Sequence, residues 1–203
     1  MIDFITLCDY IGTFAFAISG IRLASAKQFD WFGAYVVGLI TAVGGGTVRD
    51  MLLNATPFWM EQPSYFIVSG FALLFVLIFR RYVIHLNNTF FIFDAIGLGL
   101  FVIVGIVKTL SFGFPMWVAI VMGTITGSFG GMIRDIIINE VPLVFRKDIY
   151  ALACVMGGIA YMICLQTELP SALSQFIAAA TVFVVRILAV KYHISVPVLK
   201  GEE

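Results

Sequence analysis

Runs of apolar residues long enough to cross a lipid bilayer dominate this sequence. Hydrophobic residues make up 61% of the chain and charged residues only 12%. A water-soluble core of 203 residues cannot hide that much apolar surface, whereas a bilayer core about 30 Å thick requires roughly 20 mostly apolar residues per helix. Seven such runs are present, near residues 4–24, 31–55, 64–84, 90–110, 115–138, 149–167 and 172–192. We therefore predict an all-α polytopic membrane protein with seven transmembrane helices in a single membrane domain, residues 1–203.

Basic residues are concentrated on one side of the predicted membrane. The loops on this side contain Arg22, Lys27, Arg80, Arg81, Arg146, Lys147, Lys191 and Lys200, whereas those on the other side contain Lys108 beside Asp3, Glu61 and Glu168. Because loops rich in lysine and arginine stay in the cytoplasm, this bias predicts an external N-terminus and a cytoplasmic C-terminus. The first apolar run lacks the basic segment of a cleaved signal peptide, so we expect it to be retained as the first span.

The first three predicted helices align with the second three at an ungapped offset of 85 residues. The matching pairs include Asp9 and Asp94, Gly12 and Gly97, Phe16 and Phe101, Gly20 and Gly105, Gly38 and Gly123, Thr41 and Thr126, Arg49-Asp50 and Arg134-Asp135, Asn54 and Asn139, Pro57 and Pro142, and Tyr65 and Tyr150. We therefore predict two repeats, about 4–84 and about 89–167, followed by a seventh helix at about 172–192. Because each repeat has three spans, the second enters the membrane from the opposite side. Such inverted repeats are common in proteins that move solutes through their own centre.

Consecutive glycines interrupt the second and fifth predicted helices. Gly44, Gly45 and Gly46 form a triplet, and Gly130 and Gly131 form a pair in the second repeat. Each glycine costs a helix about 1 kcal/mol relative to alanine in water, so we predict a kink or an unwound turn at these positions. Backbone that opens at membrane depth must be buried in protein or line a water-filled cavity.

Other small residues accompany these glycines. Thr41 and Thr126, about one turn earlier, either offer their hydroxyl groups to a pore or bond back to their own helices. We expect close helix packing at four further glycines, Gly12, Gly20, Gly97 and Gly105.

Arg49 and Arg134 are charged residues within predicted spans. Inserting a charged side chain at the centre of a membrane helix costs about 2.5–3.5 kcal/mol of free energy on insertion scales. Such a side chain therefore normally faces the interior of the bundle and has a partner there. Helical rise brings Arg49 to the depth of Asp9 near the outer end, and Arg134 to the depth of Asp94 near the cytoplasmic end. These pairs either neutralise charge and fix helix register, or line and gate a water-filled path.

Four other charged residues flank these pairs. Asp50 and Asp135 each follow an arginine and would add carboxylates to such a path. We expect Arg186 to extend to the cytoplasmic interface. Lys108 either extends to the outer interface or contributes a charge to the outer mouth.

The composition argues against several classes of function. Twelve basic and twelve acidic residues give zero net charge, so there is no basic surface for nucleic acid. Cys8, Cys154 and Cys164 lack the spacing and the neighbouring histidines of a metal or redox site, so we predict buried apolar cysteines and no bound metal or cofactor. His85 and His193 have no evident catalytic partner and no catalytic motif is present, so we expect no enzyme activity.

The duplicated motifs GGGTVRD at 44–50 and GGMIRD at 130–135, within three-helix halves followed by a seventh helix, resemble the prokaryotic branch of the trimeric intracellular cation (TRIC) channel family. The resemblance extends to about residue 190. It implies a homotrimer in the prokaryotic cell (inner) membrane, in contact with membrane lipid, with a pore for monovalent cations, chiefly potassium, inside each protomer. By this resemblance, helices 2 and 5 line the pore and kink at Gly44, Gly45, Gly46, Gly130 and Gly131, and Arg49-Asp50 and Arg134-Asp135 are the charged segments that follow.

Two functions are compatible with these features. The first is a passive potassium-permeable channel, favoured because the glycines lie about two-thirds of the way along helices 2 and 5, which suits two constrictions better than one central site. The second is a secondary transporter of a small amino acid such as glycine, a label that the same prokaryotic family also carries. In a transporter the repeats would rock around a central substrate site.

Overall fold

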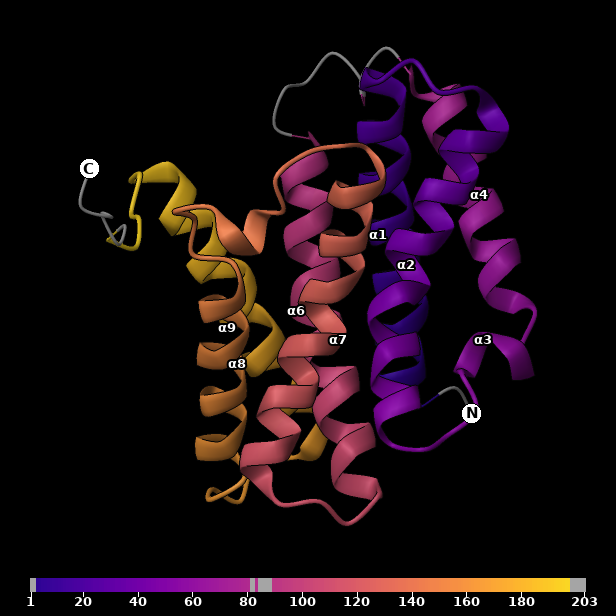
Figure 1. Ribbon diagram of the computed structural model, residues 1–203. Coiled ribbons are helices and arrows are strands. Elements are labelled where there is room, and N and C mark those ends of the chain that lie inside the picture. The colour runs from indigo at the N-terminus through magenta and orange to yellow at the C-terminus, as the bar shows by residue number, and fades with distance from the viewer. Residues whose placement is uncertain (1–2, 81–82, 84–88, 198–203) are drawn as a thin grey trace.

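The computed structural model, which describes residues 3–80, 83 and 89–197, is a bundle of α-helices (Figure 1). Its elements in chain order are α1 (Phe4–Ala26), α2 (Trp31–Leu52), α3 (Phe58–Glu61), α4 (Ser64–Ile78), α6 (Thr89–Ser111), α7 (Met116–Ile137), the 3-10 helix η1 (Leu143–Phe145), α8 (Ala151–Cys164) and α9 (Ser171–Lys191). Five of these helices, α1, α2, α6, α7 and α9, are long and apolar enough to cross a membrane. The chain is therefore an all-helical, multi-pass membrane protein, as predicted.

Two of the predicted spans are shorter than predicted. α4 has 15 residues and α8 has 14, whereas a bilayer core needs about 20. α4 ends at Ile78, and the predicted end of that span, at residue 84, lies outside the described residues, as do Arg81, His85 and Lys200. α8 begins only at Ala151 because the chain bends over residues 146–150.

Local chemistry explains where the helices begin and end. Proline stands directly before five helices: Pro57 before α3, Pro63 before α4, Pro115 before α7, Pro142 before η1 and Pro170 before α9. Proline is tolerated there because the first N–H groups of a helix have no partner within it. α2 and α7 are each followed by an asparagine in the left-handed region, Asn54 with φ 54° and Asn139 with φ 57°. Asparagine adopts this conformation more readily than most residues, so it ends both helices at equivalent points.

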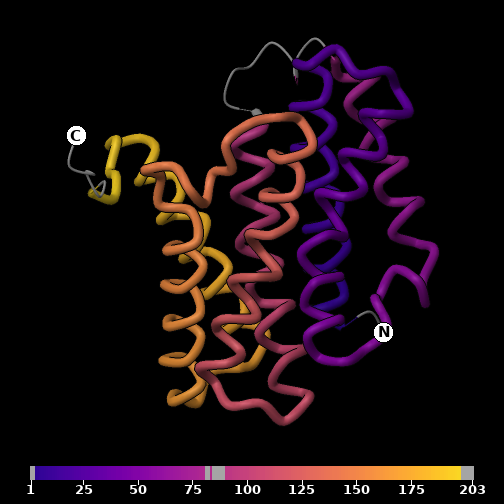
Figure 2. The backbone as a smooth tube through the Cα atoms, viewed as in Figure 1, coloured from indigo at the N-terminus to yellow at the C-terminus, as the bar shows by residue number. Residues whose placement is uncertain are grey.

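Four helices, α1, α2, α6 and α7, form the centre of the bundle. α4 packs against α1 and α2 on one flank, while α8 and α9 pack against each other and against α7 and α6 on the other (Figure 1). In Figure 2, α1 begins at the lower end of the bundle and α9 finishes towards the upper end. The α1–α2 and α7–α8 connections lie at the upper end, and the α6–α7 and α8–α9 connections at the lower end.

Glycines bring the central helices into close contact. A β-carbon on Gly20 would lie 2.9 Å from the Cα atom of Gly38, where α1 meets α2. A β-carbon on Gly105 would lie 2.8 Å from the Cα atom of Gly123, where α6 meets α7. Gly12 and Gly97 similarly make room for the rings of Phe101 and Phe16. The predicted packing role of these four α1 and α6 glycines is confirmed.

Candidate ion pathway

α2 and α7 cross at their glycines without a break in either helix. Both helices are continuous through residues 44–46 and 130–131, so the predicted unwound turn is wrong. A β-carbon on Gly45 would overlap the carbonyl oxygen of Thr126, and one on Gly130 would overlap that of Thr41. The absence of a side chain therefore lets the two backbones touch, and the intact helices keep their backbone hydrogen bonds.

The remaining residues of this region face neighbouring side chains or their own helices. Gly44 lies near the Ile133 side chain, Gly46 against the Phe58 ring, and Gly131 against the Tyr150 hydroxyl group. The hydroxyl groups of Thr41 and Thr126 donate 2.6 Å hydrogen bonds to carbonyl oxygens one turn earlier in their own helices. Of the two roles predicted for these threonines, the structure has the bond back to the helix.

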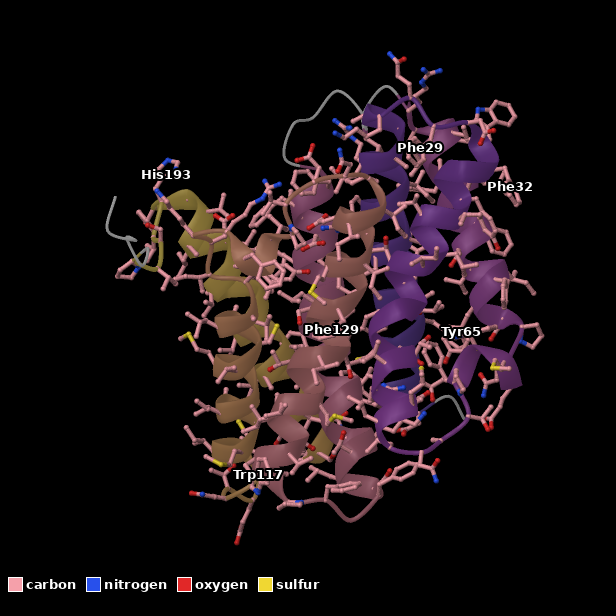
Figure 3. All side chains as sticks on the ribbon, in the orientation of Figure 1. Phe29, Phe32, Tyr65, Trp117, Phe129 and His193 are labelled. Carbon is pink, nitrogen blue, oxygen red and sulfur yellow. The ribbon has the colours of Figure 1, made fainter. Side chains whose placement is uncertain are left out.

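We call the two charged clusters of the interior outer and inner after the orientation predicted from the sequence. The outer cluster lies where α1, α2, α4 and α6 meet at the lower end of the bundle. Asp9 accepts a 2.5 Å hydrogen bond from the hydroxyl group of Tyr65, which Figure 3 labels. Arg49 Nε lies 2.8 Å from Asp50 Oδ1, and Lys108 Nζ lies 2.9 Å from the same oxygen. The predicted ion pair between Asp9 and Arg49 is not formed, because each of these residues has another partner.

The inner charged cluster contains the ion pair predicted for the second repeat. Arg134 Nη1 lies 2.5 Å from Asp94 Oδ1 and donates a 2.9 Å hydrogen bond to Ser19 Oγ. Arg134 Nε donates a 2.9 Å hydrogen bond to Asp135. Arg134 and Asp94 are both fully buried, so this network lies in the interior between α1, α6 and α7.

Asp50 and Asp135 join each arginine to the segment that follows its helix. One carboxylate oxygen binds the arginine, and the other accepts a backbone hydrogen bond, from Phe58 N at 3.0 Å in the first repeat and from Leu143 N at 3.1 Å in the second. Each carboxylate thus neutralises a buried guanidinium and holds the start of a short helix.

Two cavities approach these clusters from opposite ends of the bundle. The outer cavity, of about 330 Å³, has a polar lining that includes Thr6, Asp9, Arg49, Glu61 and Lys108. A separate space with no room for a water molecule shares Asp9, Arg49 and Phe58 with this cavity, and its other lining residues are Ala42, Gly46, Phe101 and Thr126. The inner cavity, of about 170 Å³, is lined on its polar side by Lys27, Arg134, Asp135, Glu140 and Arg146. The outer and inner cavities share no lining residue.

Ion pairs surround the mouth of the inner cavity. Lys27 Nζ lies 2.7 Å from Glu140 Oε1, and Arg146 Nη2 lies 3.3 Å from Glu140 Oε2. The hydrogen bond and the positive charge of Lys27 lower the pKa of the Glu140 carboxyl. The three side chains are all exposed, so this cluster joins the α1–α2 connection to the segment after α7 at the surface.

Lys108 and Arg186 are two further basic residues of the membrane-spanning helices. Lys108 binds Asp50 and lines the outer cavity, so its predicted role as a charge of the outer mouth stays a prediction. Arg186 is only 1% exposed, so its predicted extension to the interface is wrong. Its guanidinium lies 4.9 Å from the ring centres of both Phe91 and Tyr150, and it donates a 3.0 Å hydrogen bond to the carbonyl oxygen of Ile149. Aromatic rings and a backbone acceptor thus replace solvent around this cation.

Comparisons with known proteins agree with this architecture. The family model described as "Glycine transporter" matches residues 6–81 and 91–166, two stretches whose first residues are 85 positions apart. A UPF0126 membrane protein of Vibrio cholerae is 38% identical over 193 residues, covering 94% of this chain and 81% of the relative. The UPF0126 inner membrane protein YadS of Escherichia coli is 35% identical over 198 residues, covering 96% of each chain.

Two solved structures are similar to this chain over almost its whole length. The crystal structure of the TRIC trimeric intracellular cation channel orthologue from Rhodobacter sphaeroides has a TM-score of 0.87 and 32% identity, covering 94% of this chain and 98% of that one. A second structure, of a TRIC cation channel studied for its conductance, has a TM-score of 0.85 and 34% identity, covering 97% and 98%. The chain belongs to the prokaryotic TRIC family.

In this TRIC family member, three further side chains, for which the sequence predicts no role, shape the clusters. Tyr65 binds Asp9, Phe58 packs over Gly46, and Ser19 bonds to both Asp94 and Arg134. A signal for Tyr65 was present, since the offset of 85 pairs it with Tyr150. Phe58 and Ser19 have no such signal, because the matching positions hold Leu143 and Val104.

Proposed function

We propose that this chain forms a homotrimeric channel for monovalent cations, permeable to potassium, with one pore inside each protomer. The pore follows α2 and α7 and joins the outer and inner cavities. One membrane domain, 1–203, contains an inverted pair of three-span repeats, about 4–84 and about 89–167, and a seventh span at about 172–192. The protein lies in the inner membrane, in contact with lipid, with its N-terminus outside and its C-terminus in the cytoplasm.

The observation that carries this proposal is the pair of cavities that enter the bundle from opposite ends and have charged side chains in their linings. The outer cavity reaches Asp9 and Arg49, and the inner cavity reaches Arg134. Charged side chains that line cavities within a membrane bundle are typical of solute pathways. The narrow space beside Phe58 and the buried ion pair of Arg134 are then two constrictions of a closed pore.

The charges of the outer cluster favour cations over anions. Three carboxylates, those of Asp9, Asp50 and Glu61, are present with two basic groups, those of Arg49 and Lys108. Both basic groups bind Asp50, whereas Asp9 forms no ion pair within the described part of the chain and accepts a hydrogen bond from a neutral tyrosine. The charge of Asp9 is therefore available to a passing cation.

The contacts within the two halves support the inverted repeat. Residues 85 positions apart make equivalent contacts at the Gly20–Gly38 and Gly105–Gly123 packing sites, and at the Arg49–Asp50 and Arg134–Asp135 ion pairs. The two stretches matched by the family model have the same spacing.

A potassium efflux assay tests the channel proposal. Vesicles loaded with KCl and containing the purified protein should lose potassium faster than empty vesicles, down its gradient and without saturation. Asp9→Asn should slow the efflux about two- to fivefold, because it removes one charge at the entrance. Asp30→Asn, which changes a carboxylate at the start of α2 outside both cavities, is the matched control. Efflux no faster than from empty vesicles would overturn the proposal.

A homotrimer is supported by the solved relative described as a trimeric channel, which matches 94% of this chain. Native mass spectrometry of the protein in detergent should give the mass of three chains. A mass of one chain would contradict this part of the proposal, while the efflux assay would still test the pore.

The second candidate is a secondary transporter of a small amino acid, favoured by the description "Glycine transporter" of the matching family model. A transporter exposes its site to one side at a time, so uptake of labelled glycine into the same vesicles would saturate and would be reduced by unlabelled glycine. Saturable uptake without passive potassium efflux would replace the channel with this function.

A further inference from the structure

The outer and inner cavities are lined by equivalent positions of the two predicted repeats. Three positions of the outer lining correspond at the offset of 85 to three of the inner lining: Arg49 to Arg134, Phe58 to Leu143, and Glu61 to Arg146. The outer members belong to α2 and α3, and the inner members belong to α7, to η1 and to the residue that follows η1. The two cavities can therefore be compared position by position.

The ends of α1 and α6 extend this correspondence to the opposite wall of each cavity. Ala26 near the end of α1 lines the inner cavity, and its counterpart Ser111 at the end of α6 lines the outer cavity. Leu23 and Lys108 form a second pair of the same kind. Because the same positions line both cavities, differences between the cavities come from the residue types at these positions.

The equivalent positions 61 and 146 carry opposite charges. Glu61 is exposed and forms no ion pair within the described part of the chain. Arg146 is also exposed, and it shares the carboxylate of Glu140 with Lys27, which lies closer to that carboxylate, at 2.7 Å against 3.3 Å. One carboxylate thus compensates two basic groups. The rim of the outer cavity has an excess of negative charge, and the rim of the inner cavity has an excess of positive charge.

The charges behind the two rims leave this difference in place. In the outer cavity Arg49 and Lys108 both bind Asp50, so the carboxylate of Asp9 adds to the negative charge of the rim. In the inner cavity Arg134 binds two carboxylates, and all three side chains are buried behind the rim. Three carboxylates therefore accompany two basic groups at the outer end, whereas three accompany three at the inner end, where two of the basic groups are exposed.

We infer that Glu61 and Arg146 set the sign of the electrostatic potential at the two mouths, so that the outer mouth attracts cations and the inner mouth repels them. Charges at the rim of a cavity with low-dielectric walls act on an ion before it enters. Cations therefore enter more readily from the outer side, and inward cation current exceeds outward current. This directional preference rests on the proposed function, whereas the difference in potential between the cavities does not.

The experiment measures the potential in each cavity with a cysteine introduced at one of two equivalent positions, Ala26 or Ser111. Both positions are exposed, and the three native cysteines are buried. A cationic and an anionic methanethiosulfonate of similar size are applied to the protein in detergent at about 0.01 M salt, where screening is weak. Mass spectrometry gives the two modification rates. Their ratio cancels the reactivity of the thiol itself, and it depends neither on ion current nor on the orientation of the protein.

The cation-to-anion ratio of rates should be about fivefold higher for Ser111→Cys than for Ala26→Cys. Glu61→Arg should lower the ratio for Ser111→Cys about fivefold and leave that for Ala26→Cys unchanged. Arg146→Glu should raise the ratio for Ala26→Cys by a similar factor and leave that for Ser111→Cys unchanged. If Arg146→Glu does not fold, Arg146→Gln should raise the same ratio about twofold. Glu168→Arg, at an exposed position outside both cavities, is the control for an equal change of charge elsewhere.

Equal ratios at the two positions, or ratios that respond to no substitution at Glu61 or Arg146, would overturn the inference even in a protein that conducts potassium. The expected ratios in a protein that fails the efflux assay would retain the difference in potential and overturn the channel. In a conducting protein, single-channel current in symmetric KCl should be larger when cations are driven inward, and the double variant Glu61→Arg/Arg146→Glu should reverse this preference. Equal currents in both directions would overturn the directional preference.

Discussion

Arg134 Nη1 lies 2.5 Å from Asp94 Oδ1, and both side chains are fully buried. An ion pair withdrawn from water loses the hydration of both charges, so each partner depends on the other for compensation. Because Arg134 also lines the inner cavity, we expect the same contact both to stabilise the fold and to close that cavity towards the centre.

Arg134→Gln should open the inner end and destabilise the protein. The substitution leaves Asp94 buried with its charge uncompensated, which costs about 3–5 kcal/mol. We expect a higher open probability in bilayer recordings and a lower unfolding temperature in detergent. The double variant Arg134→Gln/Asp94→Asn should regain much of the stability while keeping the higher open probability. An unchanged open probability in both variants would show that this pair does not gate the pathway.

Lys108→Gln should increase cation current at low salt. Lys108 Nζ lies 2.9 Å from Asp50 at the outer mouth, and its removal leaves a more negative entrance. We expect roughly a two- to fivefold increase in current at about 0.01 M KCl, and little change at about 1 M, where screening is strong. Glu61→Gln, in the same cavity, should have the opposite effect. A decrease in current for Lys108→Gln would contradict this electrostatic account.

Gly45→Ala should destabilise the crossing of α2 and α7. A β-carbon on Gly45 would overlap the carbonyl oxygen of Thr126, so the helices must move apart, at a cost of about 1–3 kcal/mol. Gly70→Ala in α4 is the control, because nothing lies within 4 Å of a β-carbon there. It should be neutral or stabilising by up to about 1 kcal/mol. Thermal unfolding in detergent compares the two, and equal unfolding temperatures would exclude close contact at Gly45.

The ion pair of Glu140 with Lys27 should persist in mild acid. Lys27 lowers the pKa of the Glu140 carboxyl, so its stabilising contribution is present above the ordinary pKa of glutamate, about 4.3, and is lost as the pH falls through the lower folded value. An NMR titration of this carboxyl should have its midpoint below the ordinary value. Lys27→Gln should move the midpoint upwards. A midpoint that does not respond to Lys27→Gln would mean that the pair is not formed in solution.

Predictions from the sequence were correct where the surroundings of a residue leave it a single physical role. Depth matching identified the partner of Arg134, because a guanidinium buried in a membrane bundle requires a carboxylate at the same level. The spacing of small residues along one helix face predicted the packing role of Gly20 and Gly105, and the structure has them in close contact with the neighbouring backbone. The offset of 85 residues predicted equivalent contacts in both halves, and the structure has them at the glycine packing sites and at the arginine–aspartate pairs.

The same reasoning failed where partners come from distant segments. Asp9 and Arg49 have matching depths, but Tyr65 binds Asp9 and the Phe58 ring attracts Arg49. Arg186 is long enough to reach the interface, but the Phe91 and Tyr150 rings enclose it. The depth of a residue in the membrane and the length of its side chain do not reveal these aromatic neighbours, because the rings come from other segments of the chain.

The glycine triplet illustrates a different limit. Absence of a side chain favours both an unwound helix and a close approach of two intact helices. Only the position of the opposing helix decides between them, and in this protein α7 lies directly against Gly45.

The central claim is that the chain conducts cations through its interior, and single-channel recording tests it most directly. Purified protein would be placed in planar bilayers under a KCl gradient, with Arg49→Ala and Asp50→Asn variants beside the wild type. We predict discrete openings that reverse near the potassium equilibrium potential and that change in amplitude or open probability in both variants. A silent bilayer, with saturable glycine uptake into vesicles of the same preparation, would contradict the channel and make the interior a substrate pathway.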